Sequence, residues 1–261
     1  MAHLLPRAKA PRRRKTALLT ALLAGWAAQS ASLAQSESGN DPAESSSQRV
    51  TVTSVKSVAG ITGFGNMPLA SVPMQVGVTT AEQFKDLGIR RLSDITTLDP
   101  SVGDGYNADG YYDFLSVRGF VIDNRANYRR DGLPISAETT IPLDNKSRIE
   151  VLKGTSGMLG GIGSPGGMVN LVVKRPTEAP IQDLFVGWQQ DGSLLAQADL
   201  SQRFGERREL GLRLNAAYEH IDPQTYAAEG NRYLLSVAGD WRAGADTLLE
   251  AELEYSRREQ P

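Results

Sequence analysis

Long stretches of alternating apolar and polar residues fill the last third of the chain. From Leu210 to Tyr218 every second residue is apolar, and polar side chains such as Arg213 and Asn215 lie between them. Because successive side chains of a β-strand point to opposite faces of the sheet, this alternation predicts strands with one apolar and one polar face. The same pattern predicts five strands, at residues 182–190, 194–203, 210–221, 232–242 and 247–257.

The length and charge of these strands favour a transmembrane β-barrel over a soluble β-sandwich, which also alternates. Strands of about 9 to 11 residues cross a bilayer with apolar side chains toward lipid and polar ones toward the lumen. Five strands cannot close such a barrel, because an open edge leaves backbone groups unpaired in hydrocarbon, so we expect a fragment of a longer protein. Aromatic residues lie near strand ends, as in the belts of membrane barrels: Trp188, Tyr218, Trp241 and Tyr255.

The preceding region has short helices and strands separated by glycine-rich turns. Thr80 can cap a helix that ends at Gly88, and a second short helix is predicted within residues 89–98. Strands are predicted at residues 114–120, 148–152 and 166–173. The fold class expected is therefore an α+β domain followed by the antiparallel strands of an incomplete transmembrane β-barrel.

The N-terminus has the three parts of a secretory signal peptide. A basic cluster ends at Lys15, a short apolar run follows, and small residues precede Gln35. A membrane anchor is the alternative, but a spanning helix needs about 20 apolar residues, more than this run contains. We therefore assign residues 1–34 to a cleaved signal peptide, 35–49 to a disordered tether, 50–177 to the α+β domain and 178–261 to the five strands.

Composition excludes several kinds of site. The chain has no cysteine, so disulfides and thiolate metal sites are excluded, and two histidines, His3 and His220, are too few for a histidine metal cluster. Of the 28 Lys and Arg residues, six lie in the expected signal peptide, which leaves 22 against 30 acidic residues and a net charge of -8. Nucleic-acid binding depends on basic residues that neutralise phosphates and is not expected. No nucleophile and base combination indicates an enzyme, and no cofactor is expected.

Four motifs occur in order between residues 115 and 176. They are LSVRGF at residues 115–120, RDGLP at 130–134, RIEVLKG at 148–154 and GSPGGMVNLVVKRP at 163–176. In this order and spacing they resemble the plug domain of TonB-dependent outer-membrane receptors, and the last is most similar to the ferrichrome-type siderophore branch. The resemblance covers residues 50–261.

The glycines from Gly161 to Gly166 also match the GxGxxG pattern of dinucleotide-binding proteins. That pattern has to open a helix whose N-terminus faces the pyrophosphate, whereas residues 168–173 have the pattern of a strand. We therefore interpret these glycines as tight turns in a compact domain.

The resemblance implies roles for two charged residues and one short segment. Arg118 of the RGF motif and Glu150 of the EVLKG motif correspond to plug residues that pair with charges on the barrel wall; the alternative is that each is an ordinary solvated strand charge. A segment after the tether resembles the TonB box, which the periplasmic protein TonB captures as an added strand, and the alternative is that it is the first plug strand. Its residues are Val50, Thr51, Val52 and Thr53.

By the same resemblance, ligand contacts are expected in plug loops at residues 103–113, 122–130 and 158–162. Aromatic and hydrogen-bonding side chains in these loops suit a bulky, polar iron chelate, although a loop tyrosine can instead cover apolar surface. The residues expected to bind the ligand are Tyr106, Asn107, Asp123, Asn124 and Tyr128.

The function that the resemblance implies is uptake of ferric siderophores by a TonB-dependent receptor in the outer membrane of a Gram-negative bacterium. The expected partners are TonB with its inner-membrane energising complex, the iron–siderophore complex and outer-membrane lipid. Two alternatives stay open: a receptor for another cargo, such as cobalamin or a carbohydrate, and a soluble plug-like binding module. Because the barrel is incomplete, the chain alone is not expected to transport.

Overall fold

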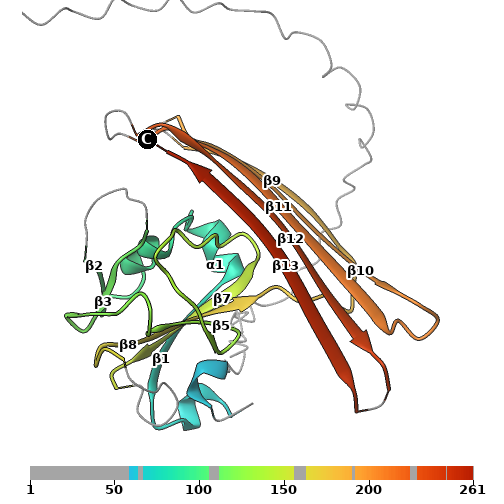
Figure 1. Cartoon of the computed structure of the whole chain (residues 1–261), viewed down its shortest axis with the longest axis horizontal. Helices are drawn as coiled ribbons and strands as arrows, with labels where there is room; N and C mark the ends of the chain where they lie inside the picture. The colour runs from blue at the N-terminus through green and yellow to red at the C-terminus, as the bar shows by residue number, and fades with distance from the viewer. Residues whose placement is uncertain are drawn as a thin grey trace, which may run out of the picture. The chain divides into compact units, whose positions relative to one another are not determined.

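The structure is a computed structural model that describes residues 59–63, 67–105, 112–155, 163–189, 192–223, 228–244 and 246–260. The expected signal peptide, tether and TonB box lie outside these residues. The residues that follow Val52 form one compact unit. Within it we distinguish an N-terminal domain, residues 59–176, and a C-terminal sheet, residues 181–259 (Figure 1).

The helices of the N-terminal domain are short. The helix predicted after Thr80 is confirmed, because the Thr80 side chain accepts a hydrogen bond from the Gln83 backbone N–H and the Gln83 side chain accepts one from the Thr80 N–H. The second predicted helix is a 3₁₀ helix. The helices of the described residues are η1 (Gly60–Thr62), η2 (Leu69–Ser71), α1 (Ala81–Asp86) and η3 (Leu92–Thr97).

Two small sheets complete the N-terminal domain. The larger has the strand order β1-β7-β8-β5-β6, and only its β5–β8 pair is parallel. Its strands are β1 (Gln75–Thr80), β5 (Tyr128–Arg130), β6 (Leu133–Pro134), β7 (Lys146–Lys153) and β8 (Gly167–Val173). The smaller has the order β2-β3-β4, with β2 (Val102–Asp104), β3 (Leu115–Val117) and β4 (Phe120–Val121).

The prediction of one continuous strand over residues 114–120 is wrong. Arg118 and Gly119 have positive φ angles of 53° and 82°, so the chain turns there and β4 folds back onto β3. The predicted strands at residues 148–152 and 166–173 are confirmed as β7 and β8. These two strands pair through the middle of the domain, and their apolar side chains form its core with α1 and η3.

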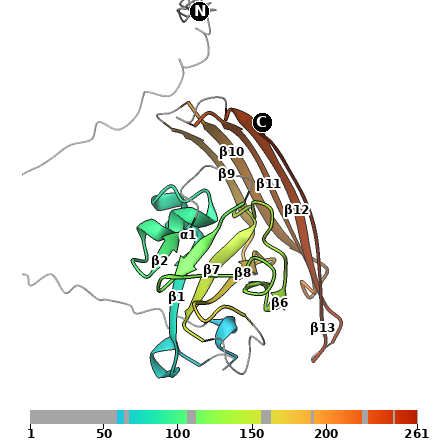
Figure 2. The ribbon, with the colours of Figure 1, turned by 60° about the vertical axis from the view of Figure 1, so that its left-hand side comes forward.

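The C-terminal sheet contains the five predicted strands, joined in sequence order by hairpins and antiparallel throughout. Figure 2 shows them side by side as one long curved sheet. The described strands do not close into a barrel. They are β9 (Ile181–Trp188), β10 (Leu194–Phe204), β11 (Leu210–Ile221), β12 (Gly230–Arg242) and β13 (Leu248–Glu259).

Apolar side chains are exposed on one face of this sheet and polar side chains are buried on the other, the reverse of a soluble protein. On the outer face, Leu184 and Trp188 are 79% and 70% exposed, whereas Asn215 and Ser236 on the other face are 2% and 1% exposed. A soluble sandwich would bury the apolar side chains instead, so the observed burial fits strands with apolar groups toward lipid. None of the helices in the described parts of the chain combines the length and apolar character that a membrane-spanning helix requires.

Gly167 allows β7 and β8 to approach each other closely. Its φ angle is 144°, and a Cβ atom there would overlap the backbone oxygen of Leu152. We predict that Gly167→Ala lowers the free energy of unfolding by about 3 kcal/mol or more, because the two central strands have to separate. Urea unfolding of the full chain, followed by tryptophan fluorescence, measures this change.

Gly88→Ala is the matched control for this substitution. Gly88 also has a positive φ angle, 68°, but nothing lies within 4 Å of an added Cβ. The control should cost about 1 kcal/mol, the price of the backbone conformation alone. Equal losses for the two variants would contradict the close-approach explanation.

Candidate functional site

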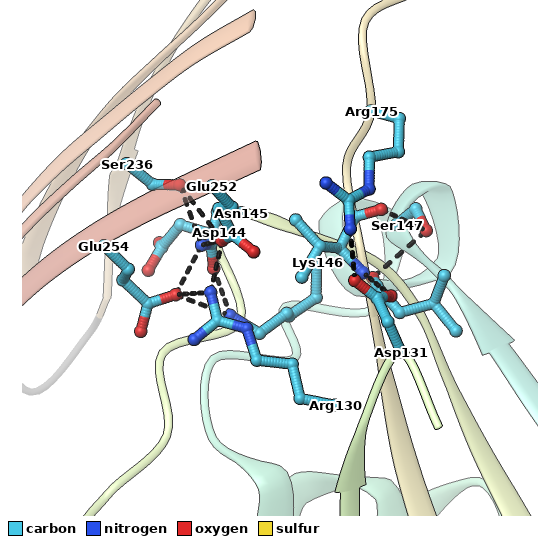
Figure 3. Close-up of polar contacts among 12 residues, drawn as sticks. Arg130, Asp131, Asp144, Asn145, Lys146, Ser147, Arg175, Ser236, Glu252 and Glu254 are labelled. Carbon is cyan, nitrogen blue, oxygen red and sulfur yellow. Dashed lines mark hydrogen bonds and ion pairs between the residues drawn. The ribbon is translucent and has the colours of Figure 1, made fainter. Parts of the chain in front are cut away.

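Three consecutive residues before and at the start of β7 connect the N-terminal domain to the C-terminal sheet. Asp144, Asn145 and Lys146 contact side chains of β10, β12 and β13. Figure 3 shows Asn145 and Lys146 pointing toward acidic side chains of β13. We call this segment the anchor.

The anchor meets a pair of carboxylates on β13. Asn145 Nδ2 donates to Glu254 at 2.6 Å and to Ser236 at 3.1 Å, and Lys146 Nζ donates to Glu254 at 2.9 Å. Arg130, from β5, pairs with Glu254 at 2.7 Å and also with Glu252. Two cations therefore face two carboxylates across this contact (Figure 3).

Asp144 makes the second contact of the anchor. It pairs with Arg232 of β12 and accepts a hydrogen bond from Gln197 of β10. Burial alone would raise the pKa of Asp144, but the charge and hydrogen bonds of Arg232 outweigh burial and hold the pKa below its usual value of 3.8. Asp144 is therefore ionised in the folded protein at neutral pH.

Lys146 has almost no exposed side-chain surface, 1%, so its charge depends on its partners. Burial lowers the pKa of Lys146 from its usual value of 10.5, and the charge of Glu254 opposes that change. Replacing a buried ion pair by apolar groups is often nearly neutral, but removing one partner leaves an uncompensated charge. The anchor therefore favours one placement of the domain on the sheet.

Further ion pairs join the two parts on either side of the anchor. Lys174 pairs with Asp199 of β10 at 2.9 Å, and the same carboxylate pairs with Arg213 of β11 at 2.8 Å. Arg90, just before η3, pairs with Glu219 of β11 at 3.1 Å. These contacts are made with the polar face of the C-terminal sheet, so that face is the binding surface for the N-terminal domain.

Glu150 does not lie at the wall, contrary to its expected role. It is completely buried, and it accepts hydrogen bonds from the backbone of Gly60 at 3.1 Å and of Ile61 at 3.0 Å. Asn170 donates to it at 2.9 Å and Arg148 pairs with it at 2.8 Å. All these partners belong to the N-terminal domain, so Glu150 fastens η1 to β7 and β8.

Arg118 is exposed and donates a hydrogen bond to the side chain of Gln75. Among the described residues it has no carboxylate partner. Its expected pairing with a wall charge therefore stays a prediction.

A hollow of about 640 Å³ opens beside the loop that follows β4. Asp123 and Asn124, both expected to bind ligand, line it. Tyr112, Phe114, Arg125, Glu138 and Ser164 are among the other lining residues, and the rings of Tyr112 and Phe114 are 6.0 Å apart in an edge-to-face arrangement. We call this cavity the loop hollow.

Asn127 holds the loop hollow in shape, and sequence analysis missed it. Its Oδ1 accepts hydrogen bonds from the backbone of Asp123 at 3.2 Å and of Ser164 at 3.0 Å, and its Nδ2 donates to the backbone oxygen of Gly167. It thereby ties the loop after β4 to the glycine-rich segment before β8. An added Cβ at Gly163 would come within 2.9 Å of the Asn127 amide, which agrees with a structural role for these glycines.

Of the remaining expected ligand residues, Tyr128 does not line the loop hollow. Tyr128 is completely buried in the core, and burial raises the pKa of its hydroxyl, so it does not offer a surface contact. Tyr106 and Asn107 lie outside the described residues. The described residues also contain no group of three or more His, Cys, Asp and Glu side chains that could hold a metal ion.

The anchor was also missed by sequence analysis, although a signal for it exists. The three polar residues, the last of them within β7, stand at the beginning of a strand whose side chains are mostly buried. In the strand predicted at residues 247–257, Glu252 and Glu254 are two positions apart and therefore lie on one face. Polar residues at the start of a buried strand and acids on a lumenal face would together have indicated the contact.

We predict that Lys146→Met destabilises the folded chain by about 3 kcal/mol, because Glu254 loses a buried partner. Urea unfolding measures the change. Arg125→Met is the matched control, since Arg125 also pairs with a glutamate, Glu138, but at the surface. The control should leave the unfolding midpoint unchanged, and a similar loss in both variants would contradict the role of the anchor.

The ionisation of Asp144 makes the stability of the folded chain depend on pH. Because its folded pKa lies below the usual 3.8, its stabilising contribution is complete above that pH and is lost as the pH falls through the folded pKa. Asp144→Asn should therefore be less stable than the unaltered chain at pH 7, and the difference should shrink below about pH 4. Unfolding curves from pH 7 to pH 2 measure it; a difference that grows on acidification would show the opposite linkage.

Comparison with known proteins finds a matching family model and several relatives. Residues 68–168 match the family described as TonB-dependent Receptor Plug Domain. The ferrichrome outer membrane transporter/phage receptor of Escherichia coli K12 is 26% identical over 80% of this chain and 28% of its own length. The ferripyoverdine receptor of Pseudomonas aeruginosa is 29% identical over 70% of this chain and 23% of its own.

A solved structure agrees with the sequence matches. The ferripyoverdine receptor of the outer membrane of Pseudomonas aeruginosa, bound to ferripyoverdine, has a TM-score of 0.65 and 25% identity over 71% of this chain and 25% of that one. The chain thus spans about a quarter of the length of these relatives. Relatives of this kind are transport receptors, not enzymes. Residues 68–168 of the chain thus match the plug domain of TonB-dependent receptors, and the five antiparallel strands after it match the start of the barrel of such outer-membrane receptors.

Proposed function

We propose that this chain is part of a receptor that takes up ferric siderophores across the outer membrane with energy from TonB. The observation that carries the proposal is the N-terminal domain held by ion pairs on the polar face of a sheet whose other face is apolar. The relatives named above are a ferrichrome transporter and a ferripyoverdine receptor. Further strands of the same protein would close the barrel and are needed for transport.

The loop hollow is the proposed place of ligand contact. Its volume, about 640 Å³, lies in the range of small-molecule sites, and its lining combines two aromatic rings with polar groups. Asn124 is largely buried there, and its Oδ1 has no hydrogen-bond partner among the described residues. Because an unpaired buried acceptor is costly, a donor group on a ligand would stabilise this loop.

The proposed TonB box, Val50 to Thr53, precedes the first described residues by a few positions. Those residues form η1, which Glu150 fastens to β7 and β8 through two backbone N–H groups. β1 follows and, among the described strands, lies at the edge of the sheet and pairs with β7 alone. Figures 1 and 2 show η1, in blue, at the end of the domain away from α1. A pull on the box would therefore act on the hydrogen bonds of Glu150 before it acted on the apolar core of the domain.

Iron uptake by cells that encode the receptor tests the proposal. Deletion of the gene should abolish uptake of one radiolabelled ferric siderophore, and so should deletion of TonB. Uptake that persists without TonB would overturn the proposal, and a defect confined to cobalamin or a carbohydrate would assign another cargo.

The box is tested by Val52→Pro. Proline removes a backbone N–H and fixes φ, so pairing with an added TonB strand should fail and uptake should drop to the level of the TonB-deficient strain. Binding of the siderophore to the cell surface should persist. Normal uptake in this variant would place the box elsewhere.

The loop hollow is tested by the double substitution Asp123→Ala and Asn124→Ala. It should weaken siderophore binding about tenfold, the effect of losing hydrogen bonds to a polar ligand. Arg207→Ala, an exposed change in the turn between β10 and β11, is the control and should bind normally. Unchanged binding in the double variant would exclude the hollow as the contact site.

A further inference from the structure

A second cavity, of about 180 Å³, lies between the η3 region and the ends of the C-terminal strands. The N-terminal domain contributes residues around η3 and residues 140–142 to its lining, and the sheet contributes residues next to its 189–193 and 221–230 connections. Guanidinium groups reach it from three elements. We call it the arginine pocket after its four arginines: Arg90, Arg91, Arg232 and Arg258.

The pocket lining includes two carboxylates, Asp94 and Glu219. Asp94 accepts hydrogen bonds from the backbone N–H groups of Arg90 and Arg91, both at 2.8 Å, and so caps η3. Glu219 is shared by Arg90 at 3.1 Å and Arg232 at 2.8 Å. The lining therefore carries four guanidinium groups against two carboxylates.

Two more carboxylates approach these arginines. Asp144 contacts Arg232, and Asp113 lies 3.4 Å from Arg91. Neither of them lines the pocket. Three of these four carboxylates, Glu219, Asp113 and Asp144, therefore pair with Arg90, Arg91 or Arg232.

Arg258 is in a different position. Its Nε donates to the Gln260 amide oxygen at 2.7 Å, and among the described residues no carboxylate lies within ion-pair distance of it. The next residue along the strand, Arg257, points to the opposite face of β13 and pairs with Glu259. The alternation of β13 thus directs one arginine outward and leaves the guanidinium of the other at the pocket, where it can form a forked pair with an anion.

The arginine pocket and the loop hollow are lined from two common stretches of the chain. Asp113, the partner of Arg91, directly follows Tyr112 of the hollow. Glu138 lines the hollow and Thr140, two residues later, lines the pocket.

We propose that the arginine pocket binds an oxyanion, a carboxylate or phosphate group, with Arg258 as its principal partner. The identification of this anion as a side group of the transported ligand rests on the proposed function, but binding of a simple oxyanion to the pocket does not. The anion pairs with the Arg258 guanidinium, which has no carboxylate within ion-pair distance among the described residues, and the Gln189 side chain lies in the lining of the same pocket. The pocket would favour acidic ligands over neutral ones.

Protection of Arg258 from phenylglyoxal in the full, unaltered chain tests the proposal. The chain in detergent is treated with the reagent alone, with inorganic phosphate or with tricarballylate, and modification of each arginine is followed by peptide mass spectrometry. Both anions should slow the reaction of Arg258 about tenfold, as expected for a charge-assisted pair, and leave Arg257 unaffected. Protection by phosphate alone or by tricarballylate alone distinguishes the two kinds of anion. Equal rates for Arg258 with and without both anions would overturn the proposal.

Titration calorimetry with the protecting anion provides the second measurement. Arg258→Gln should weaken binding about tenfold, Arg258→Lys should weaken it less because the charge remains, and Arg257→Gln should leave it unchanged. Equal affinity in all four proteins would also overturn the proposal. Because these probes contain no iron chelate, a negative result rejects the pocket and leaves the proposed uptake function standing, whereas normal anion binding with no siderophore uptake rejects only the function.

Discussion

The structure depends on charge pairing between the N-terminal domain and the polar face of the C-terminal sheet. Buried carboxylates and cations on that face would be unstable without partners, because a charge removed from water has to be compensated nearby. Asp144 and Lys146 supply opposite charges from one short segment, and Arg130 and Lys174 supply two more cations. The domain and the sheet therefore stabilise each other, since each satisfies charges that the other buries.

This division explains why the two parts of the chain have different residue patterns. The N-terminal domain buries an apolar core around β7 and β8, as a soluble domain does. The C-terminal sheet keeps its apolar side chains outside, toward lipid, and covers its polar side chains with the domain. The ion pairs lie between the domain and the polar face of the sheet, so they determine where the domain sits on the sheet. Apolar packing within the domain stabilises the domain itself.

The sequence predicted most of the fold but little of the site. Strict alternation was enough to predict all five long strands, since apolar residues at every second position over about ten residues indicate a β-strand. The strand over residues 114–120 was mistaken because a left-handed turn at Arg118 leaves no mark in an apolar pattern. Glu150 was expected to pair with the barrel wall and Tyr128 to bind ligand, yet both are completely buried. The role of Asn127 was overlooked. Such roles depend on contacts between residues far apart in sequence, which periodicity does not reveal.

The anchor limits how the sequence can vary. Asp144, Asn145 and Lys146 are consecutive, yet they reach β10, β12 and β13, so their spacing along the chain is matched to the spacing of the strands. Insertion or deletion of one residue here would exchange the directions of all later side chains in β7 and bring buried positions to the wrong face. Across homologous proteins, this segment should therefore vary by paired substitution and keep its length, whereas the loops around the hollow can accommodate changes in length.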